Sequence, residues 1–203
     1  MGSAIAARLE ADGFRVRAAG RSDGDLRRAD DARALVARAA AELGGLDLLV
    51  NAASEGFTPT PFEDVSEADW ERALGATAKG SFFVTQAAAP HLRRSRLALV
   101  VMIEDVAAYQ PWPSFAAHSA AKAAQAMLTR VLARALAPDV RVCGVAPGPV
   151  AVEPEQVDRR AAETLLGRVG SPDDVADAVL FLTTASFVTG SSLVVDGGRL
   201  LSR

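Results

Sequence analysis

Two patterns of apolar residues alternate along this chain. In some segments apolar residues recur every three or four positions, which is typical of helices with one buried face, whereas other segments are short runs that suit strands. The run 97–103 has seven apolar residues in succession, too few for a buried helix and enough for a strand covered on both faces. The alternation predicts an α/β fold, with a mainly parallel sheet and helices on both of its faces.

The predicted strands and helices follow one another in a regular order. Strands are expected at 14–19, 46–50, 97–103, 140–146 and 192–196, and helices at 1–11, 29–43, 66 onward, 80–92, 118–137 and 171 onward. We expect Phe14–Ala19 to pair directly beside Leu46–Val50, joined by a right-handed crossover through the helix 29–43. An empty place between these two strands would leave buried backbone groups without partners.

Composition fits a single domain over residues 1–203, because 50% of the residues are hydrophobic and 23% are charged. A net charge of −3 gives no electrostatic footprint for nucleic acid or an anionic membrane. The single cysteine, Cys143, excludes an internal disulfide and fits a reducing compartment. No apolar run approaches the roughly 20 residues of a membrane span, and no secretory leader is recognised, so we expect a cytoplasmic protein. The two histidines lie far apart in sequence, so metal-ligand spacing is absent.

Acidic and basic residues gather at one predicted edge of the sheet. Glu104 and Asp105 directly follow the strand 97–103, at the end where open parallel sheets bind ligands. His118 and Lys122 are four residues apart, so they share one face of the next helix. Lys122 would disfavour a charged imidazole, whereas the carboxylates would favour it, and His118 could donate a proton near neutral pH. An ordinary helical histidine beside an ordinary carboxylate is the alternative interpretation.

The stretch 97–122 resembles the short-chain dehydrogenase/reductase family, whose helix carries Tyr-x-x-x-Lys. Here the motif reads His118-Ser119-Ala120-Ala121-Lys122, with histidine in place of the tyrosine. Family members usually have a serine thirteen residues earlier, where this chain has Asp105, as in the pteridine reductase branch. The tail 195–203 also resembles that branch. The resemblance implies a Rossmann-like fold, NADPH as cofactor and, as candidate catalytic residues, Asp105, His118, Lys122, Glu104 and Thr77.

The resemblance is weakest in the half that would bind the cofactor. Relatives begin with a buried strand and a glycine-rich turn that delivers the pyrophosphate to the first helix, and Gly2 matches at most the last glycine of that turn. A helix–strand unit of the relatives is also missing after Ser22, so the fold is expected to lack the usual first strand and to have fewer strands. If NADPH binds, the resemblance assigns its contacts to Gly2, Arg21, Ser22, Asp25, Leu26, Asn51, Pro147 and Gly148. A polar turn at 20–22 and a strand-end role for Asn51 are the alternatives.

Substrate contacts are expected from the loops around this edge and from the tail. The candidates are Phe57, Tyr109, Trp112 and Arg203, the last of which is expected to reach the pocket of a neighbouring subunit. The segment 151–166 is expected to form a lid. An alanine-rich face of the helix 118–137 predicts a homodimer or homotetramer, as in relatives that pair through this helix.

Three functions are compatible with these residues. The leading interpretation is a reductase-derived enzyme that acts by acid–base catalysis on a planar, nitrogen-containing small molecule without hydride transfer, for example a cyclisation of Pictet–Spengler type, with no cofactor. The second is an NADPH-dependent reductase of C=N or C=O bonds. The third is an inactive subunit that pairs with an intact relative. Binding of NADPH separates the first two interpretations.

Overall fold

The computed structural model describes residues 1–56 and 58–202, so two sequence-predicted substrate residues, Phe57 and Arg203, lie outside this description. Within the described residues the strands form one parallel sheet in the order β1-β2-β3-β4. They are β1 (Leu48–Asn51), β2 (Leu99–Ile103), β3 (Arg141–Pro147) and β4 (Ser192–Val195). The predicted α/β fold with a parallel sheet is confirmed.

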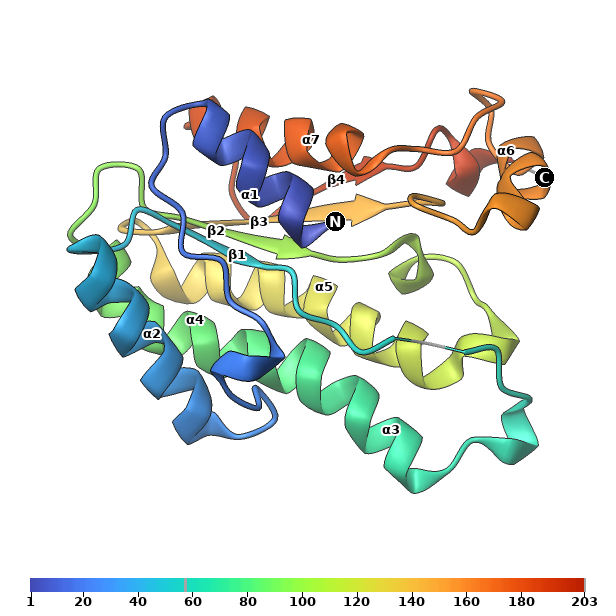
Figure 1. Ribbon diagram of the computed structural model, residues 1–203, viewed down its shortest axis with the longest axis horizontal. Coiled ribbons are helices and arrows are strands. Elements are labelled where there is room, and N and C mark those ends of the chain that lie inside the picture. Colours follow the sequence, from blue (N-terminus) through green and yellow to red (C-terminus); the bar gives the residue numbers. More distant parts are fainter. Residues whose placement is uncertain (57, 203) are drawn as a thin grey trace.

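Helices cover both faces of this sheet (Figure 1). The helices α1 (Gly2–Ala11) and α7 (Pro172–Thr184) pack against each other on one face. On the other face lie α2 (Ala29–Leu43), α4 (Gly80–Leu92) and α5 (Ala116–Leu136). Two shorter helices, α3 (Glu67–Leu74) and α6 (Val157–Ala162), lie toward the carboxyl ends of the strands. Since both faces are covered, all five residues of β2 are buried.

Local sequence signals explain where several helices begin and end. Ser66 accepts a hydrogen bond from the backbone N–H of Asp69, whose carboxylate returns to Ser66, so a capping box starts α3. Ser171 caps α7 in the same way, with Pro172 at the first helical position. Gly44 ends α2 in the left-handed conformation, with φ of 80°.

The prediction for residues 14–19 is wrong. They form no strand, and among the described residues β1 pairs only with β2, so 14–19 do not pair with β1. Within the described residues, the backbone groups of 15–19 make no hydrogen bond to other backbone groups. Side chains hold the segment instead: Arg15 donates to the carbonyls of the last turn of α2, and Arg17 pairs with Glu42. Local strand propensity was not enough, because a strand needs a neighbour at hydrogen-bonding distance.

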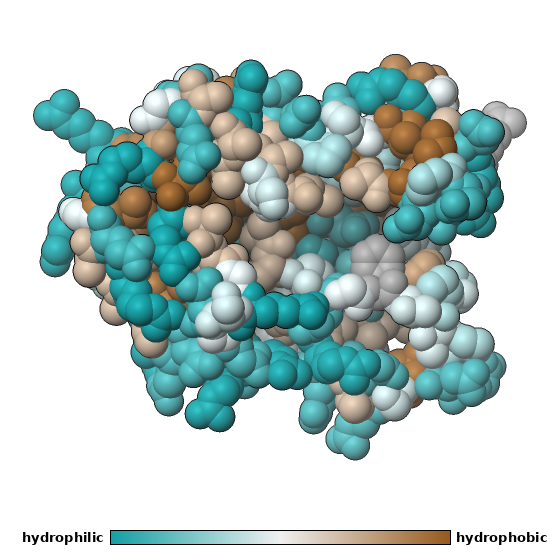
Figure 2. Space-filling model, in the orientation of Figure 1, coloured by the Kyte–Doolittle hydropathy of each residue, from teal (hydrophilic) through white to brown (hydrophobic). Residues whose placement is uncertain are grey.

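A large apolar groove lies where close pairing was predicted. It has a volume of about 1330 Å³ and runs along the outer edge of β1, between α1, residues 13–19 and α2. Apolar residues gather on this side of the molecule between α1 and α2 (Figure 2). The sheet therefore stays open at β1, and the expectation that no empty place would remain is also wrong.

Candidate active site

Asp105 stands at the carboxyl end of β2, where the chain leaves the sheet. One oxygen, Oδ1, accepts the backbone N–H of Ala107 at 2.8 Å, which caps the 3₁₀ turn Val106–Ala108. The other oxygen, Oδ2, lies 3.3 Å from Nε2 of His118. The turn therefore fixes the carboxylate, and the second oxygen is left to face the imidazole.

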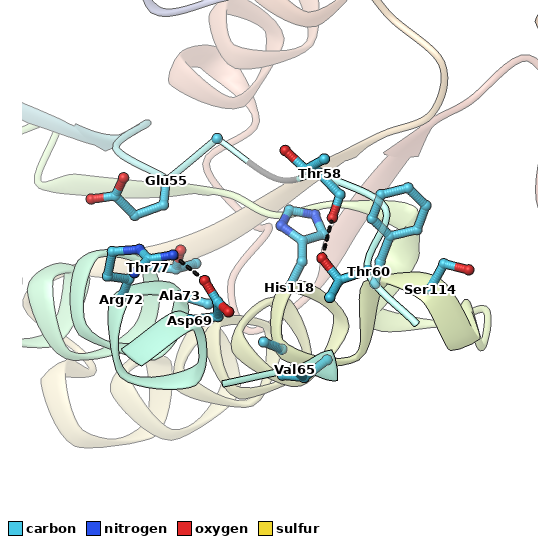
Figure 3. A pocket seen from close by; sticks show the side chains of 13 residues that line it. Glu55, Thr58, Thr60, Val65, Asp69, Arg72, Ala73, Thr77, Ser114 and His118 are labelled. Atoms are coloured by element: carbon cyan, nitrogen blue, oxygen red, sulfur yellow. Dashed lines mark hydrogen bonds and ion pairs between the residues drawn. The ribbon is translucent and has the colours of Figure 1, made fainter. Parts of the chain in front are cut away.

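His118 lies in the first turn of α5 and is buried, at 7% exposure. Figure 3 shows its ring directed toward Thr58 and Thr60 of the loop that follows β1. The structure thus brings together Asp105 and His118, which are thirteen residues apart in sequence, as the pattern predicted. The donor and acceptor roles of the two ring nitrogens depend on which tautomer is present.

Lys122 follows one turn later on α5 and is 4% exposed. Its Nζ donates to the carbonyl of Ile103 at 2.7 Å and to Oε1 of Gln125 at 3.1 Å. Burial lowers the pKa of Lys122 to about 8, while the charges of Asp105 and Glu104 act in the opposite direction and raise it. The ammonium group is therefore close to neutralisation at mildly alkaline pH.

Glu104, predicted as a catalytic candidate, points away from His118 into the protein and is 2% exposed. Hydroxyl groups of Tyr109, Thr129 and Ser192 donate to its carboxylate. Tyr109 is thereby tied to the interior through its hydroxyl, although 39% of the residue is exposed. Burial raises the pKa of Tyr109, with Glu104 adding to the effect.

A cavity of about 140 Å³ opens in front of His118 (Figure 3). Thr77 lines it from a π-helical segment, Gly75–Lys79, that joins α3 to α4. Such insertions are frequent at functional sites, and no residue pattern in the sequence signalled this one. The other lining residues come from the loop after β1, from α3 and from the start of α5: Glu55, Gly56, Thr58, Thr60, Val65, Asp69, Arg72, Ala73, Ser114, Phe115, Ala117 and His118. Asp69 and Arg72 form an ion pair on this wall, and the Ser66 hydroxyl lowers the pKa of Asp69.

Some of the residues predicted to hold a cofactor lie at the groove or the surface, and others point into the protein. Gly2 lines the large groove, and the Arg21 side chain is 87% exposed and pairs with Glu55. Asn51 instead turns inward and donates to Thr85 and to the sulfur of Met102. Leu26 packs against the core beneath α2 and α4.

The four remaining cofactor candidates have neighbours within the chain. Ser22 lies in a 3₁₀ turn, Arg21–Asp23. Asp25 is held by Arg27, whose side chain lowers the Asp25 pKa to about 2. Pro147 ends β3 and Gly148 follows it; a Cβ at Gly148 would overlap the backbone of Asp196, so only glycine fits.

The C-terminal tail packs on the segment 151–166 of the same chain. Arg199 forms an ion pair with Glu163, next to α6, and its guanidinium lies 5.2 Å from the ring centre of Trp112. Ser202 donates to the carbonyl of Glu163. Trp112 therefore stands at this edge as predicted, whereas Arg199 and Glu163 were missed. In the sequence, the only sign of this contact was the position of Arg199 next to Leu200 and Leu201.

Two other kinds of site find no support in the part of the chain that the structure describes. No group of three or more His, Cys, Asp or Glu side chains is placed to hold a metal ion there. None of the described helices is both long enough and apolar enough to cross a membrane.

Comparisons with known proteins assign this arrangement to a family. The family model described as enoyl-(acyl carrier protein) reductase matches residues 3–199. The granaticin polyketide synthase ketoacyl reductase 2 of Streptomyces violaceoruber is 35% identical over 230 positions, which cover 99% of this chain and 92% of the relative. Because 230 exceeds the 203 residues of the chain by 27, the relative has at least 27 aligned positions that this chain lacks.

Solved structures agree with this assignment. Thermoplasma acidophilum aldohexose dehydrogenase is 27% identical with a TM-score of 0.91, covering 100% of this chain and 90% of its own. A 7α-hydroxysteroid dehydrogenase complexed with NADH and a 7-oxo bile acid is 32% identical with a TM-score of 0.78, covering 86% and 71%. Matches of this extent and identity show that the chain belongs to the short-chain dehydrogenase/reductase family.

Proposed function

We propose that this chain is an NADPH-dependent reductase of a small C=O or C=N compound. In this proposal His118 donates the proton to the substrate, and Asp105 and Lys122 assist the transfer. The observation that carries the proposal is the 3.3 Å approach of His118 Nε2 to Asp105 Oδ2 beside a cavity. A histidine held by a carboxylate is a positioned general acid. The related proteins named above are dehydrogenases and reductases, which supports the same class of reaction.

Each of the three side chains has a distinct task in this proposal. His118 gives a proton to the substrate oxygen or nitrogen as that atom gains electron density. Asp105 keeps the imidazole oriented and stabilises its charged form, and the turn that holds Oδ1 keeps Asp105 in place. The ammonium of Lys122, one turn along α5, favours negative charge that develops at the reacting atom.

The residues near α1 fit a dinucleotide. The helix has no side-chain cap and no acidic residue in its first turn, so its first N–H groups remain available to a phosphate. Gly2 and Ser3 line the groove that also reaches Asn51 and Ala53, and Arg21 is exposed enough to pair with a further phosphate. When bound, NADPH supplies the hydride.

The cavity limits the size of the reacting part of the substrate. A cavity of about 150 Å³ holds one benzene-sized ring, and the cavity beside His118 is about 140 Å³. Hydroxyls of Thr58, Thr60 and Thr77 line it together with the Phe115 ring. We therefore propose a planar ring that carries the C=O or C=N group, such as a cyclic imine.

Titration with NADPH tests the proposal directly. The chain is mixed with NADPH and followed by fluorescence and calorimetry, and NADPH consumption is then measured with a cyclic imine and a cyclic ketone. We expect saturable binding and consumption, and we expect His118→Ala to keep the binding and lose the consumption. Absence of NADPH binding at millimolar concentration would contradict the proposal.

A second candidate function is acid–base catalysis without a hydride, such as closure of a ring on an iminium ion. The feature that favours it is the open groove beside β1, since residues 15–19 have no backbone partners to fix that half. Turnover that depends on His118 but proceeds without NADPH would support this candidate.

We further propose that the chain forms a homodimer through α5. The exposed side of that helix carries Met127 and Val131, each about half exposed, beside the small side chain of Ala123. Apolar residues along one helix favour pairing with a second copy by twofold symmetry. Sedimentation of the chain and of Val131→Glu measures this: the variant should shift toward the monomer mass.

A further inference from the structure

Gln125 is a fully buried glutamine on α5, three residues after Lys122. Its side chain makes a hydrogen bond at each end: Oε1 accepts from Nζ of Lys122 at 3.1 Å, and Nε2 donates to Oγ of Ser81 on α4 at 2.9 Å. The Ser81 hydroxyl in turn donates to the carbonyl of Thr77. Lys122, Ser81 and Thr77 are each at most 4% exposed. These groups therefore form a buried chain of hydrogen bonds that runs from the lysine to the π-helical segment Gly75–Lys79.

The direction of each hydrogen bond in this chain follows from its first member. A protonated lysine can only donate, so the Gln125 oxygen must face Lys122 and the Gln125 amide nitrogen must face Ser81. Because that nitrogen donates to the Ser81 oxygen, the Ser81 hydroxyl hydrogen is left for the Thr77 carbonyl, which can only accept. Turning the glutamine amide over would set two donors against each other at Lys122. The buried chain thus has a single arrangement.

At the lysine end, the chain commits two of the three ammonium hydrogens. Nζ of Lys122 donates to the carbonyl of Ile103 on β2 at 2.7 Å and to Gln125 of its own helix at 3.1 Å. Since an ammonium group has three donors, one remains for a reacting atom or a water molecule. A lysine has a flexible four-carbon stem, so two bonds to different elements are needed to aim that remaining donor.

At the other end, the chain meets the segment that carries Thr77 to the cavity. The N–H of Gly80 donates to the carbonyl of Gly75, five residues earlier, which is the π-helical pattern. The side chain of Ser81 bonds the carbonyl four residues before it, and such back-bonding often bends helices. Thr77 lines the cavity in front of His118 (Figure 3). The bond from Ser81 therefore bears on the shape of one cavity wall.

We propose that Gln125 is a positioning residue that fixes the Lys122 ammonium and the π-helical segment Gly75–Lys79 relative to each other. This role rests on the proposed function, in which Lys122 assists proton transfer. Lys122 and Gln125 come from α5, whereas Thr77 comes from the segment before α4, and Gln125 joins the two through Ser81. An apolar side chain at this position would remove one buried hydrogen-bond partner from Lys122 and one from Ser81.

NMR of the unliganded protein tests the proposal without any turnover. The chain has two lysines, and protein labelled with nitrogen-15 at lysine Nζ should show a slowly exchanging ammonium signal for the buried Lys122 and none for the exposed Lys79. Backbone hydrogen exchange over Gly75–Lys79 reports on the other end. In Gln125→Met, which has a side chain of similar length and can form neither bond, the Lys122 signal should lose most of its intensity. Exchange over Gly75–Lys79 should rise roughly three- to tenfold.

Two further variants separate the ends of the chain. Gln125→Glu keeps an acceptor for Lys122 but, as a carboxylate, cannot donate to Ser81. The lysine signal should therefore persist while exchange over Gly75–Lys79 rises. Ser81→Ala should give the same pattern, because it leaves the bond between Lys122 and Gln125 in place. Gln86→Met changes an exposed glutamine on α4 and is the matched control, which should alter neither readout.

A folded Gln125→Met protein that matches the unaltered chain in either readout would overturn the proposal. If that variant does not fold, Gln125→Glu and Ser81→Ala decide. A persistent Lys122 signal together with faster exchange over Gly75–Lys79 in these variants supports the proposal, and any other pattern overturns it.

Activity distinguishes a failure of this role from a failure of the proposed function. If the chain reduces a substrate with NADPH, Gln125→Met should lower kcat by about tenfold with little change in KM, because the loss concerns alignment at the reacting atom. Gln125→Glu should recover part of that loss. An unchanged kcat in Gln125→Met would overturn the positioning role and leave the reductase standing. If the chain reduces nothing, the NMR readouts still decide whether Gln125 joins Lys122 to Gly75–Lys79.

Discussion

The neighbouring strands β1 and β2 are alike in sequence and differ in their surroundings. Leu48 and Leu99 are partners in register, yet Leu99 is 0% exposed whereas Leu48 is only half-buried. The difference lies in the neighbours, because β2 is paired on both edges and β1 on one. The half around β2 fixes the proposed acid–base groups, while the half around β1 faces an open groove. Burial is thus a property of the assembled sheet and not of the strand sequence alone.

The largest effect of a substitution should be on turnover and should come from the half of the molecule around β2. Replacing His118 by Ala removes the general acid, and turnover should fall by about 10²–10⁴-fold. The unfolding midpoint should change little by comparison, because the lost contacts are at the site. Initial rates and urea unfolding of the same preparation measure both quantities. Full turnover in the variant would show that His118 is an ordinary buried histidine.

The two leucines sharpen the comparison between the strands. Leu99→Ala should lower the free energy of unfolding by about 2–5 kcal/mol, the range for a fully buried leucine. Leu48→Ala should cost clearly less, because part of its side chain already faces the groove. Urea denaturation of both variants gives the two values. Equal losses would mean that the groove beside β1 is filled in solution.

We expect Lys122 to make the free energy of unfolding depend on pH, with an effect somewhat smaller than that of Leu99→Ala. Its pKa is about 8 in the folded chain against an ordinary 10.5, so burial of the charged form opposes folding below pH 8. This cost is relieved as the pH rises from about 8 to 10.5. Relative to Lys122→Met, the unaltered chain should gain about 3 kcal/mol of unfolding free energy across that window. Denaturation between pH 7 and 10.5 measures the gain, and a flat difference would contradict a buried, depressed lysine.

The smallest effect should be on nucleotide affinity and should come from the half of the molecule around β1. Arg21→Ala removes an exposed cation, whose contribution to phosphate binding is worth about 1 kcal/mol or less. NADPH affinity should fall no more than about fivefold, and NADH affinity should not change. Calorimetric titration with each nucleotide separates them. A much larger loss of NADPH affinity would mean that the half of the molecule around β1 closes over Arg21 when the nucleotide binds.

The sequence was informative wherever a single segment determined its own structure. The bounds of α2 and α4 were predicted to the residue, because their apolar spacing and end signals are local. The approach of Asp105 to His118 followed from a strand end and a helical face. Residues 14–19 failed as a strand because the outcome depends on a partner at the edge of β1, which no local pattern reports.

Other parts of the site depended on long-range contacts in the same way. The Arg199–Glu163 pair joins residues 36 apart, and Glu104, after β2, meets Ser192 of β4 across the strand β3. Family resemblance named Arg203 at the tail, which lies outside the described residues, and gave no sign of Arg199. The pteridine-type chemistry inferred from Asp105 stays a prediction.

The open edge of β1 also bears on how copies of the chain meet at high concentration. An exposed strand edge is a template on which another chain can stack as cross-β structure. Charged residues beside such an edge act as gatekeepers, since stacking would bring like charges together. Arg15 and Arg17 occupy alternate positions in the segment that flanks the groove, and both are tied to the end of α2. The same two arginines that hold residues 14–19 in place therefore oppose the addition of a further strand at the edge of β1.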